Sequence, residues 1–95
     1  MTSLADVGQL ILEVLGETGQ EAMLCDLGES HRGRRVQIAL ESHGQTGKRF
    51  ELSRRAIESA GHDPVARQRL RSILRAQVLI LRATHSIDES LRRLS

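Results

Sequence analysis

Apolar residues near the start of the chain recur every three or four positions, which is the spacing of an amphipathic helix. Such a helix would bury one face, made of Leu4, Val7, Ile11, Val14 and Leu15. Ser3 stands at the N-cap position, and Asp6 follows three residues later, as a capping box requires. Gly16 and Gly19 then interrupt the pattern. The first stretch therefore predicts a capped helix that ends at these glycines.

After residue 20 the period of the pattern changes to two, which is typical of strands. Three segments alternate in this way, at residues 23–27, 36–40 and 50–52. We predict that the last two form a hairpin over residues 34–53, with Leu40 opposite Phe50. This register places the apolar side chains of both strands on one face. On the other face it pairs Glu41 with Arg49, an attractive cross-strand contact.

The bend of this hairpin is the segment HGQTGKR, residues 43–49. We expect Gly44 and Gly47 to adopt the positive φ values that a tight bend needs. The same letters partly match the phosphate-binding P-loop G-x-x-x-x-G-K-[ST]. However, only two residues separate the glycines, and Arg49 stands where that loop has a hydroxyl. We therefore predict a hairpin bend that binds no nucleotide.

Two further helices follow the third strand. A short one begins after Ser53, has the sequence RRAIESA, and stops at Gly61. Asp63 and Pro64 restart the chain, because Asp is a good N-cap and Pro suits the first helical position. No breaker follows before the end of the sequence. An alternative is a break near His85, where SIDE, residues 86–89, forms a second capping box.

The last helix carries a heptad repeat of apolar residues. One series recurs every seventh residue from Leu70 to Leu91 and has polar residues, Gln77 and Thr84, at its two middle positions. A second, wholly apolar series runs from Ile73 to Leu94. A helix of this length is about 46 Å long, whereas three short strands span only about 15–20 Å. We expect its first half to pack on the sheet and its second half to meet another copy. The predicted dimerisation residues are Ile73, Ile80, Ile87, Leu91 and Leu94.

These elements predict an α+β fold in the order α-β-β-β-α-α, with helices on one face of a three-stranded antiparallel sheet. Residues 1–95 would form one domain, made of an α-β-β-β-α unit at 1–63 and the helix at 64–95. The hydrophobic fraction of 39% and the charged fraction of 27% fit a globular chain. A single cysteine, no basic leader and no long apolar run lead us to expect a cytoplasmic protein without membrane contact.

The sequence shows no pattern typical of an enzyme. The four histidines, at positions 31, 43, 62 and 85, lack metal-ligand spacing. Cys25 belongs to the apolar set of a strand, and no G-x-S-x-G elbow is present. We therefore expect a binding protein with no catalytic residue, no metal, no cofactor and no small-molecule substrate.

Charge is distributed unevenly along the chain. Residues 1–31 contain six acids and no Lys or Arg, whereas the remainder contains all 14 cations, 13 of them Arg. Arginine matches phosphate groups bidentately, which suggests nucleic acid as a partner. The candidate phosphate contacts are Arg32, Arg34, Arg35, Lys48, Arg49, Arg54 and Arg55. The alternative is that the acidic first helix pairs with the basic remainder, within or between chains.

Some of these residues also resemble a double-stranded-RNA-binding domain. The matching features within residues 4–60 are the α-β-β-β-α order, Glu13 on the first helix, the segment GESH at 28–31 and Ser-Arg-Arg at 53–55. That family reads the shape of an RNA duplex across two minor grooves and the phosphates between them. The resemblance implies that Glu13 and His31 lie at minor grooves and that Arg54 and Arg55 hold phosphates.

Two functional hypotheses follow. The first is a non-enzymatic homodimer that contacts nucleic-acid phosphates through its arginines. The second is a protein-binding adaptor, secretion chaperone or inhibitor that uses the apolar C-terminal helix. Salt separates the two, because binding to phosphates weakens steeply as salt is raised and an apolar interface does not.

Overall fold

Helix α1 (Leu4–Glu17) begins at the capping box that the sequence predicts. The amide of Asp6 donates to Ser3 Oγ at 3.1 Å, and the amide of Ser3 donates to the Asp6 carboxylate at 3.4 Å. The helix ends at Glu17, and Thr18 caps it by donating its hydroxyl to the Leu15 carbonyl at 2.6 Å. The predicted apolar face of this helix is the buried one.

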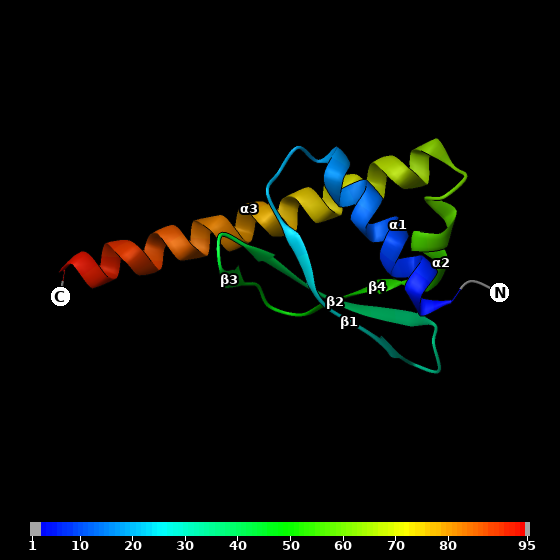
Figure 1. Ribbon diagram of the computed structural model, residues 1–95, viewed down its shortest axis with the longest axis horizontal. Coiled ribbons are helices and arrows are strands. Elements are labelled where there is room, and N and C mark those ends of the chain that lie inside the picture. Colours follow the sequence, from blue (N-terminus) through cyan, green and yellow to red (C-terminus); the bar gives the residue numbers. More distant parts are fainter. Residues whose placement is uncertain (1–2, 95) are drawn as a thin grey trace.

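The computed structural model describes the backbone of residues 3–94, and the side chains of residues 3–84 and of Leu91. After α1 come four strands and two helices (Figure 1). Their bounds are β1 (Met23–Ser30), β2 (Arg35–Ser42), β3 (Gln45–Thr46), β4 (Phe50–Ser53), α2 (Arg54–Ser59) and α3 (Pro64–Leu94). The three helices lie together on one side of the antiparallel sheet, which confirms the predicted α+β class.

Strand β2 is the centre of the sheet. It pairs with β1 along one edge and with β3 and β4 in succession along the other. The sheet therefore has four strands instead of the predicted three, because the short β3 forms within the predicted bend. Strands β3 and β4 are separated by residues 47–49, where the amide of Gly47 donates to the Leu40 carbonyl at 2.8 Å and Lys48 and Arg49 make no ladder pairs.

The predicted hairpin is confirmed, but its register is wrong by two residues. Phe50 lies opposite Ile38 instead of Leu40. The turn is tighter than expected, because His43 and Gly44 both adopt positive φ, at 52° and 78°. Gly47 does not take the positive φ predicted for it. A shift of two residues keeps every side chain on its face, so the core is unaffected.

Helix α2 begins directly after β4, and Ser53 makes no side-chain cap. Helix α3 begins at Pro64 as predicted, with Asp63 as its N-cap, because the amide of Val65 donates to Asp63 Oδ1 at 3.0 Å. Helix α3 then runs unbroken to Leu94, so the alternative of a break near His85 is wrong. The side chains of the second capping box, Ser86 and Glu89, lie outside the described part. No helix in that part is long and apolar enough to cross a membrane.

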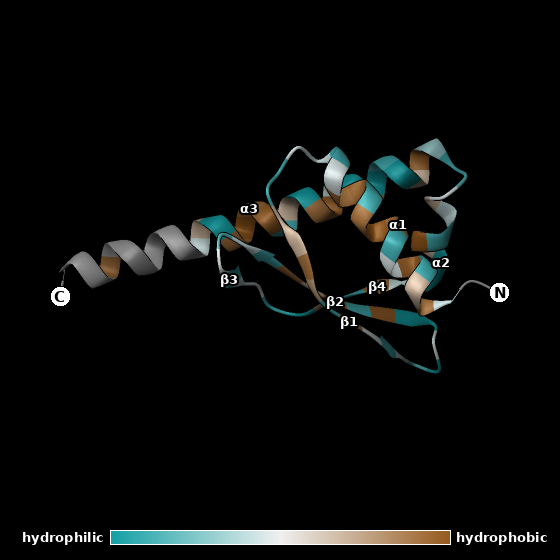
Figure 2. Ribbon diagram, in the orientation of Figure 1, coloured by the Kyte–Doolittle hydropathy of each residue, from teal (hydrophilic) through white to brown (hydrophobic). Residues whose placement is uncertain are grey.

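The core lies between the helical layer and the facing side of the sheet (Figure 2). It is formed by Val7, Ile11, Val14, Leu15, Val36, Ile38, Leu40, Ile57, Ala60, Leu70, Leu74 and Val78. Leu70 thus belongs to the core and is unavailable for the predicted seam. The molecule measures 52 × 27 × 15 Å, and α3 extends past the sheet as expected (Figure 1).

Candidate nucleic-acid interface

The turn between β1 and β2 has an unusual backbone. Three successive residues, His31, Arg32 and Gly33, adopt positive φ values of 53°, 58° and 82°. The turn is closed by hydrogen bonds from Gly33 to Ser30 at 3.2 Å and from Arg34 to His31 at 3.1 Å. A left-handed conformation costs a residue with a side chain about 1–2 kcal/mol. Such strain in an exposed turn marks a candidate functional segment.

This turn carries two arginines into solvent. Arg32 and Arg34 are both exposed and make no ion pair within the described part of the chain. Beside them lies a shallow hollow, lined by His31, Arg32, Arg34, Arg35 and Ser53. Pockets for small molecules enclose most of the ligand surface. An open hollow beside exposed arginine side chains could accept a phosphate that stays attached to a larger exposed molecule.

Arg35 is held on the outer face of the sheet by Glu51. The Glu51 carboxylate accepts Arg35 Nε at 3.2 Å, Ser30 Oγ at 3.0 Å and Gln37 Nε2 at 3.2 Å. The hydrogen bonds from Gln37 and Ser30, followed by Arg35, hold the pKa of Glu51 below its usual value. This network fixes one wall of the hollow and joins β1, β2 and β4.

Arg54 connects the start of α2 to β1 and to the β1–β2 turn. Its Nη1 lies 2.8 Å from Glu29, its Nε lies 3.2 Å from Glu58, and its side chain is only 18% exposed. It also donates to the Gly33 carbonyl at 3.5 Å. The bond to Glu29 is the main cause of a raised Arg54 pKa. Arg54, one of the candidate phosphate contacts, is thus mostly buried and held in ion pairs, whereas Arg55 is exposed.

The two cations that follow the hairpin bend lie elsewhere. Arg49 pairs with Asp26 at 2.5 Å, so the predicted pair with Glu41 is wrong. Thr46 stands opposite Glu41. Lys48 is exposed, but it lies about 17 Å along the sheet from the β1–β2 turn, at the usual strand rise. The structure thus groups Arg32, Arg34, Arg35, Arg54 and Arg55 at one end of the sheet and sets Lys48 and Arg49 apart.

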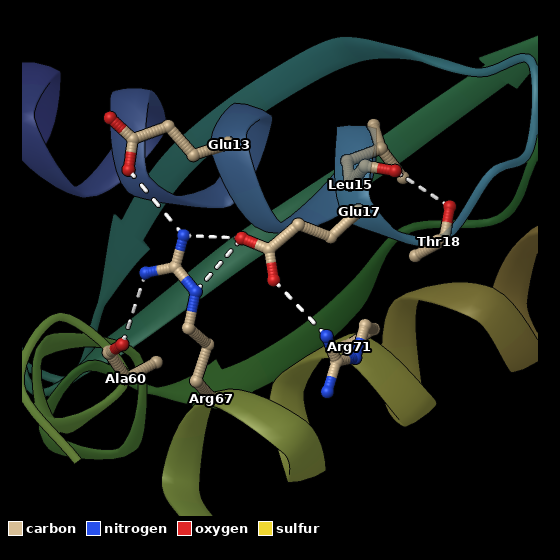
Figure 3. A network of polar contacts seen from close by, with 7 residues as sticks. All are labelled: Glu13, Leu15, Glu17, Thr18, Ala60, Arg67 and Arg71. Atoms are coloured by element: carbon tan, nitrogen blue, oxygen red, sulfur yellow. Dashed lines mark hydrogen bonds and ion pairs between the residues drawn. The ribbon is translucent and has the colours of Figure 1, made fainter. Parts of the chain in front are cut away.

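The acidic helix α1 is paired within the chain. Arg67 Nε donates to the Glu17 carboxylate at 2.9 Å, and its Nη2 lies 3.8 Å from Glu13 (Figure 3). Arg71 approaches the other oxygen of Glu17 at 3.2 Å. The hydrogen bond from Arg67 is the main cause of a lowered Glu17 pKa. The sequence left open that the acidic first helix pairs with the basic remainder of the chain. These contacts confirm such pairing within the chain for Glu13 and Glu17.

This pairing leaves an excess of free cations on the surface. Among the described side chains, the exposed cations that make no ion pair are Arg32, Arg34, Lys48, Arg55, Arg69 and Arg75. Three of them belong to the β1–β2 turn and the start of α2. These two segments are joined by the Arg54 amide, which donates to the Arg34 carbonyl at 2.9 Å.

Of the residues implied by the family resemblance, Glu13 lies apart from the turn and the start of α2. Glu13 lies on α1 beside Arg67, and His31 lies on the turn with Nδ1 3.2 Å from Ser30 Oγ. Sequence reasoning missed the left-handed turn and the Glu51 network. Gly33 was the only local signal for the turn, and the network depends on residues from three strands. No three His, Cys, Asp or Glu side chains gather into a metal site in the part described.

The chain matches no protein-family model, and no similar protein was found among curated proteins or among solved structures.

Proposed function

We propose that the protein binds the phosphate backbone of a nucleic-acid duplex through its β1–β2 turn. The observation that carries the proposal is a strained, exposed turn that presents Arg32 and Arg34 without acidic partners. Buried or paired arginines serve the fold, as Arg54 does. Two unpaired guanidinium groups beside a shallow hollow are free to bind phosphate.

The nature of the surface favours a duplex over a single strand. Proteins that bind single strands stack bases on exposed aromatic side chains. The one aromatic residue of this chain, Phe50, packs against the core. Arginines on a rigid turn can instead follow the phosphates that border a groove. The resemblance to double-stranded-RNA-binding domains supports RNA as the duplex, with His31 on the same turn.

Fluorescence anisotropy with labelled duplex RNA, duplex DNA and single strands tests the proposal. Reversing both turn arginines, R32E/R34E, is expected to weaken binding to the duplex at least tenfold. K48E/R75E changes the charge by the same amount at exposed positions that make no ion pair among the described side chains, away from the turn, and is the matched control. Neutralising the turn with R32A/R34A should also reduce the slope of log K against log salt by about 2.

The proposal fails if the unmodified protein binds none of these probes at low salt. It also fails if the turn and control variants weaken binding equally, because the effect would then be one of net charge. A partner bound by the protein with little dependence on salt would instead favour the adaptor hypothesis.

A further inference from the structure

An exposed stripe of apolar residues runs along the part of α3 that faces away from the core, between exposed polar residues such as Arg69 and Arg75. Leu70, Leu74, Val78 and Leu81 are buried against the rest of the molecule. On the opposite face four exposed residues follow one another at intervals of three and four: Ile73, Ala76, Ile80 and Ala83. This is the spacing of a coiled-coil seam. We call these four residues the outer seam.

The outer seam alternates large and small side chains. Ile80 is 58% exposed, and alanines stand at the seam positions on either side of it. Such a surface is complementary to the same surface of a second copy that runs in the opposite direction. When two such helices lie antiparallel, Ile73 would face Ala83 of the partner subunit, and Ile80 would face Ala76 of the partner subunit. Large side chains would then fill the space that small ones leave.

The same antiparallel register continues at both ends of the seam. It brings Val65 opposite Leu91 of the partner subunit, and both of these side chains are more than half exposed. Val65 borders an apolar groove between α2 and α3, whose lining also includes Leu52, Ile57 and Ile73. The part of α3 that extends past its own sheet can thus cover the groove of a second copy (Figure 1).

Charge and packing both favour the antiparallel over the parallel arrangement. Arg69 lies on the outer face one turn before Ile73 and is exposed without an ion pair. In a parallel dimer it would face its own copy, and isoleucines would meet isoleucines while alanines left gaps. In the antiparallel dimer the two Arg69 residues lie about 27 Å apart along the axis, at the usual helical rise. Repulsion at that distance is largely screened.

From this self-complementary pattern we infer that the protein forms an antiparallel homodimer through the outer seam, with a twofold axis between Ala76 and Ile80. The side chains of Ile87 and Leu94, which the heptad pattern also assigns to dimerisation, lie outside the described part. The inference is independent of nucleic-acid binding, because none of its residues belongs to the β1–β2 turn.

Analytical ultracentrifugation measures the association. Ile80→Asp is expected to raise the dissociation constant at least 100-fold. Leu12→Asp, at an exposed leucine on α1, makes the same change away from the seam and should leave association unaffected. Circular dichroism checks that both variants stay folded. A monomeric unmodified protein at tens of micromolar, or equal effects of the two substitutions, would overturn the inference.

The orientation has its own test. A spin label at Arg69→Cys, with Cys25→Ser to remove the native thiol, reports the distance between copies by pulsed electron resonance. The antiparallel dimer gives a distance near 27 Å, set by the helical rise. A distance below about 15 Å would show a parallel pair, because helices in contact lie about 8–10 Å apart, and would refute the arrangement.

Discussion

At the scale of single residues, neighbouring arginines in this chain have opposite roles. Arg54 and Arg55 are adjacent in sequence, yet only Arg54 turns back to Glu29, Glu58 and the Gly33 carbonyl. We expect Arg54→Ala to lower the midpoint of thermal unfolding by a few degrees, since it removes two ion pairs and releases the turn. Arg55→Ala should leave the midpoint within error. Equal midpoints for the two variants would show that these Arg54 contacts contribute nothing.

The turn residue Arg32 should show a conflict between stability and binding. Its φ of 58° is costly for arginine and free for glycine. Arg32→Gly is therefore expected to stabilise the protein by about 0.5–1 kcal/mol in urea unfolding, after the added freedom of the unfolded chain is deducted. The same change should weaken duplex binding. Arg32→Ala is the control, because it removes the charge but keeps the strain.

Stabilisation by Arg32→Ala as well would show that repulsion between arginines, and not the backbone, is the source of the gain. Unchanged duplex affinity in Arg32→Gly would remove Arg32 from the proposed interface.

At the scale of elements, α1 and α3 are joined by an ion pair that depends on pH. The Arg67 hydrogen bond lowers the pKa of Glu17 from its ordinary value of 4.5. The stability that Glu17 contributes is therefore complete above pH 4.5 and is lost as the pH falls through the lowered value. Glu17→Gln should be less stable than the unmodified protein at pH 7, and the gap should close on acidification. A gap that stays constant from pH 7 to pH 3 would contradict this.

The elements themselves were readable from the sequence wherever the signal was local. The capping box at Ser3 and the restart at Asp63 depend on residues a few positions apart, and both are confirmed. The hairpin register was not readable, because the apolar pattern fits two registers that differ by two residues. Only the tight turn at His43 and Gly44 chooses between them, and a histidine gives little warning of positive φ.

The candidate site was less readable than the fold for a related reason. The sequence indicates which residues are basic, but the acids that neutralise them come from other elements. Glu29 on β1 reaches Arg54, and Asp26 reaches Arg49 across the sheet. Ala39, which is opposite Asp26 on β2, is almost fully buried. Such pairings depend on strand register, which local patterns leave open.

At the scale of the whole molecule, the uneven charge has two separate uses. The acidic first helix holds the N-terminal part of α3 through Glu13, Glu17 and Arg67. The exposed arginines that make no ion pair among the described side chains lie at the β1–β2 turn, at the start of α2 and on the exposed side of α3. A net charge of +2 thus understates the positive surface that a polyanion would meet.

The docking of α1 on α3 also sets an order of events while the chain is being made. Strands β1, β2 and β4 follow one another closely and can pair as soon as they are complete. The partners of Glu17 come 50 and 54 residues later. At about 5–20 residues per second, the first helix waits about 3–10 seconds for the last one. During that interval its apolar face can pack only against the sheet and then α2, which are both complete before Arg67 is made.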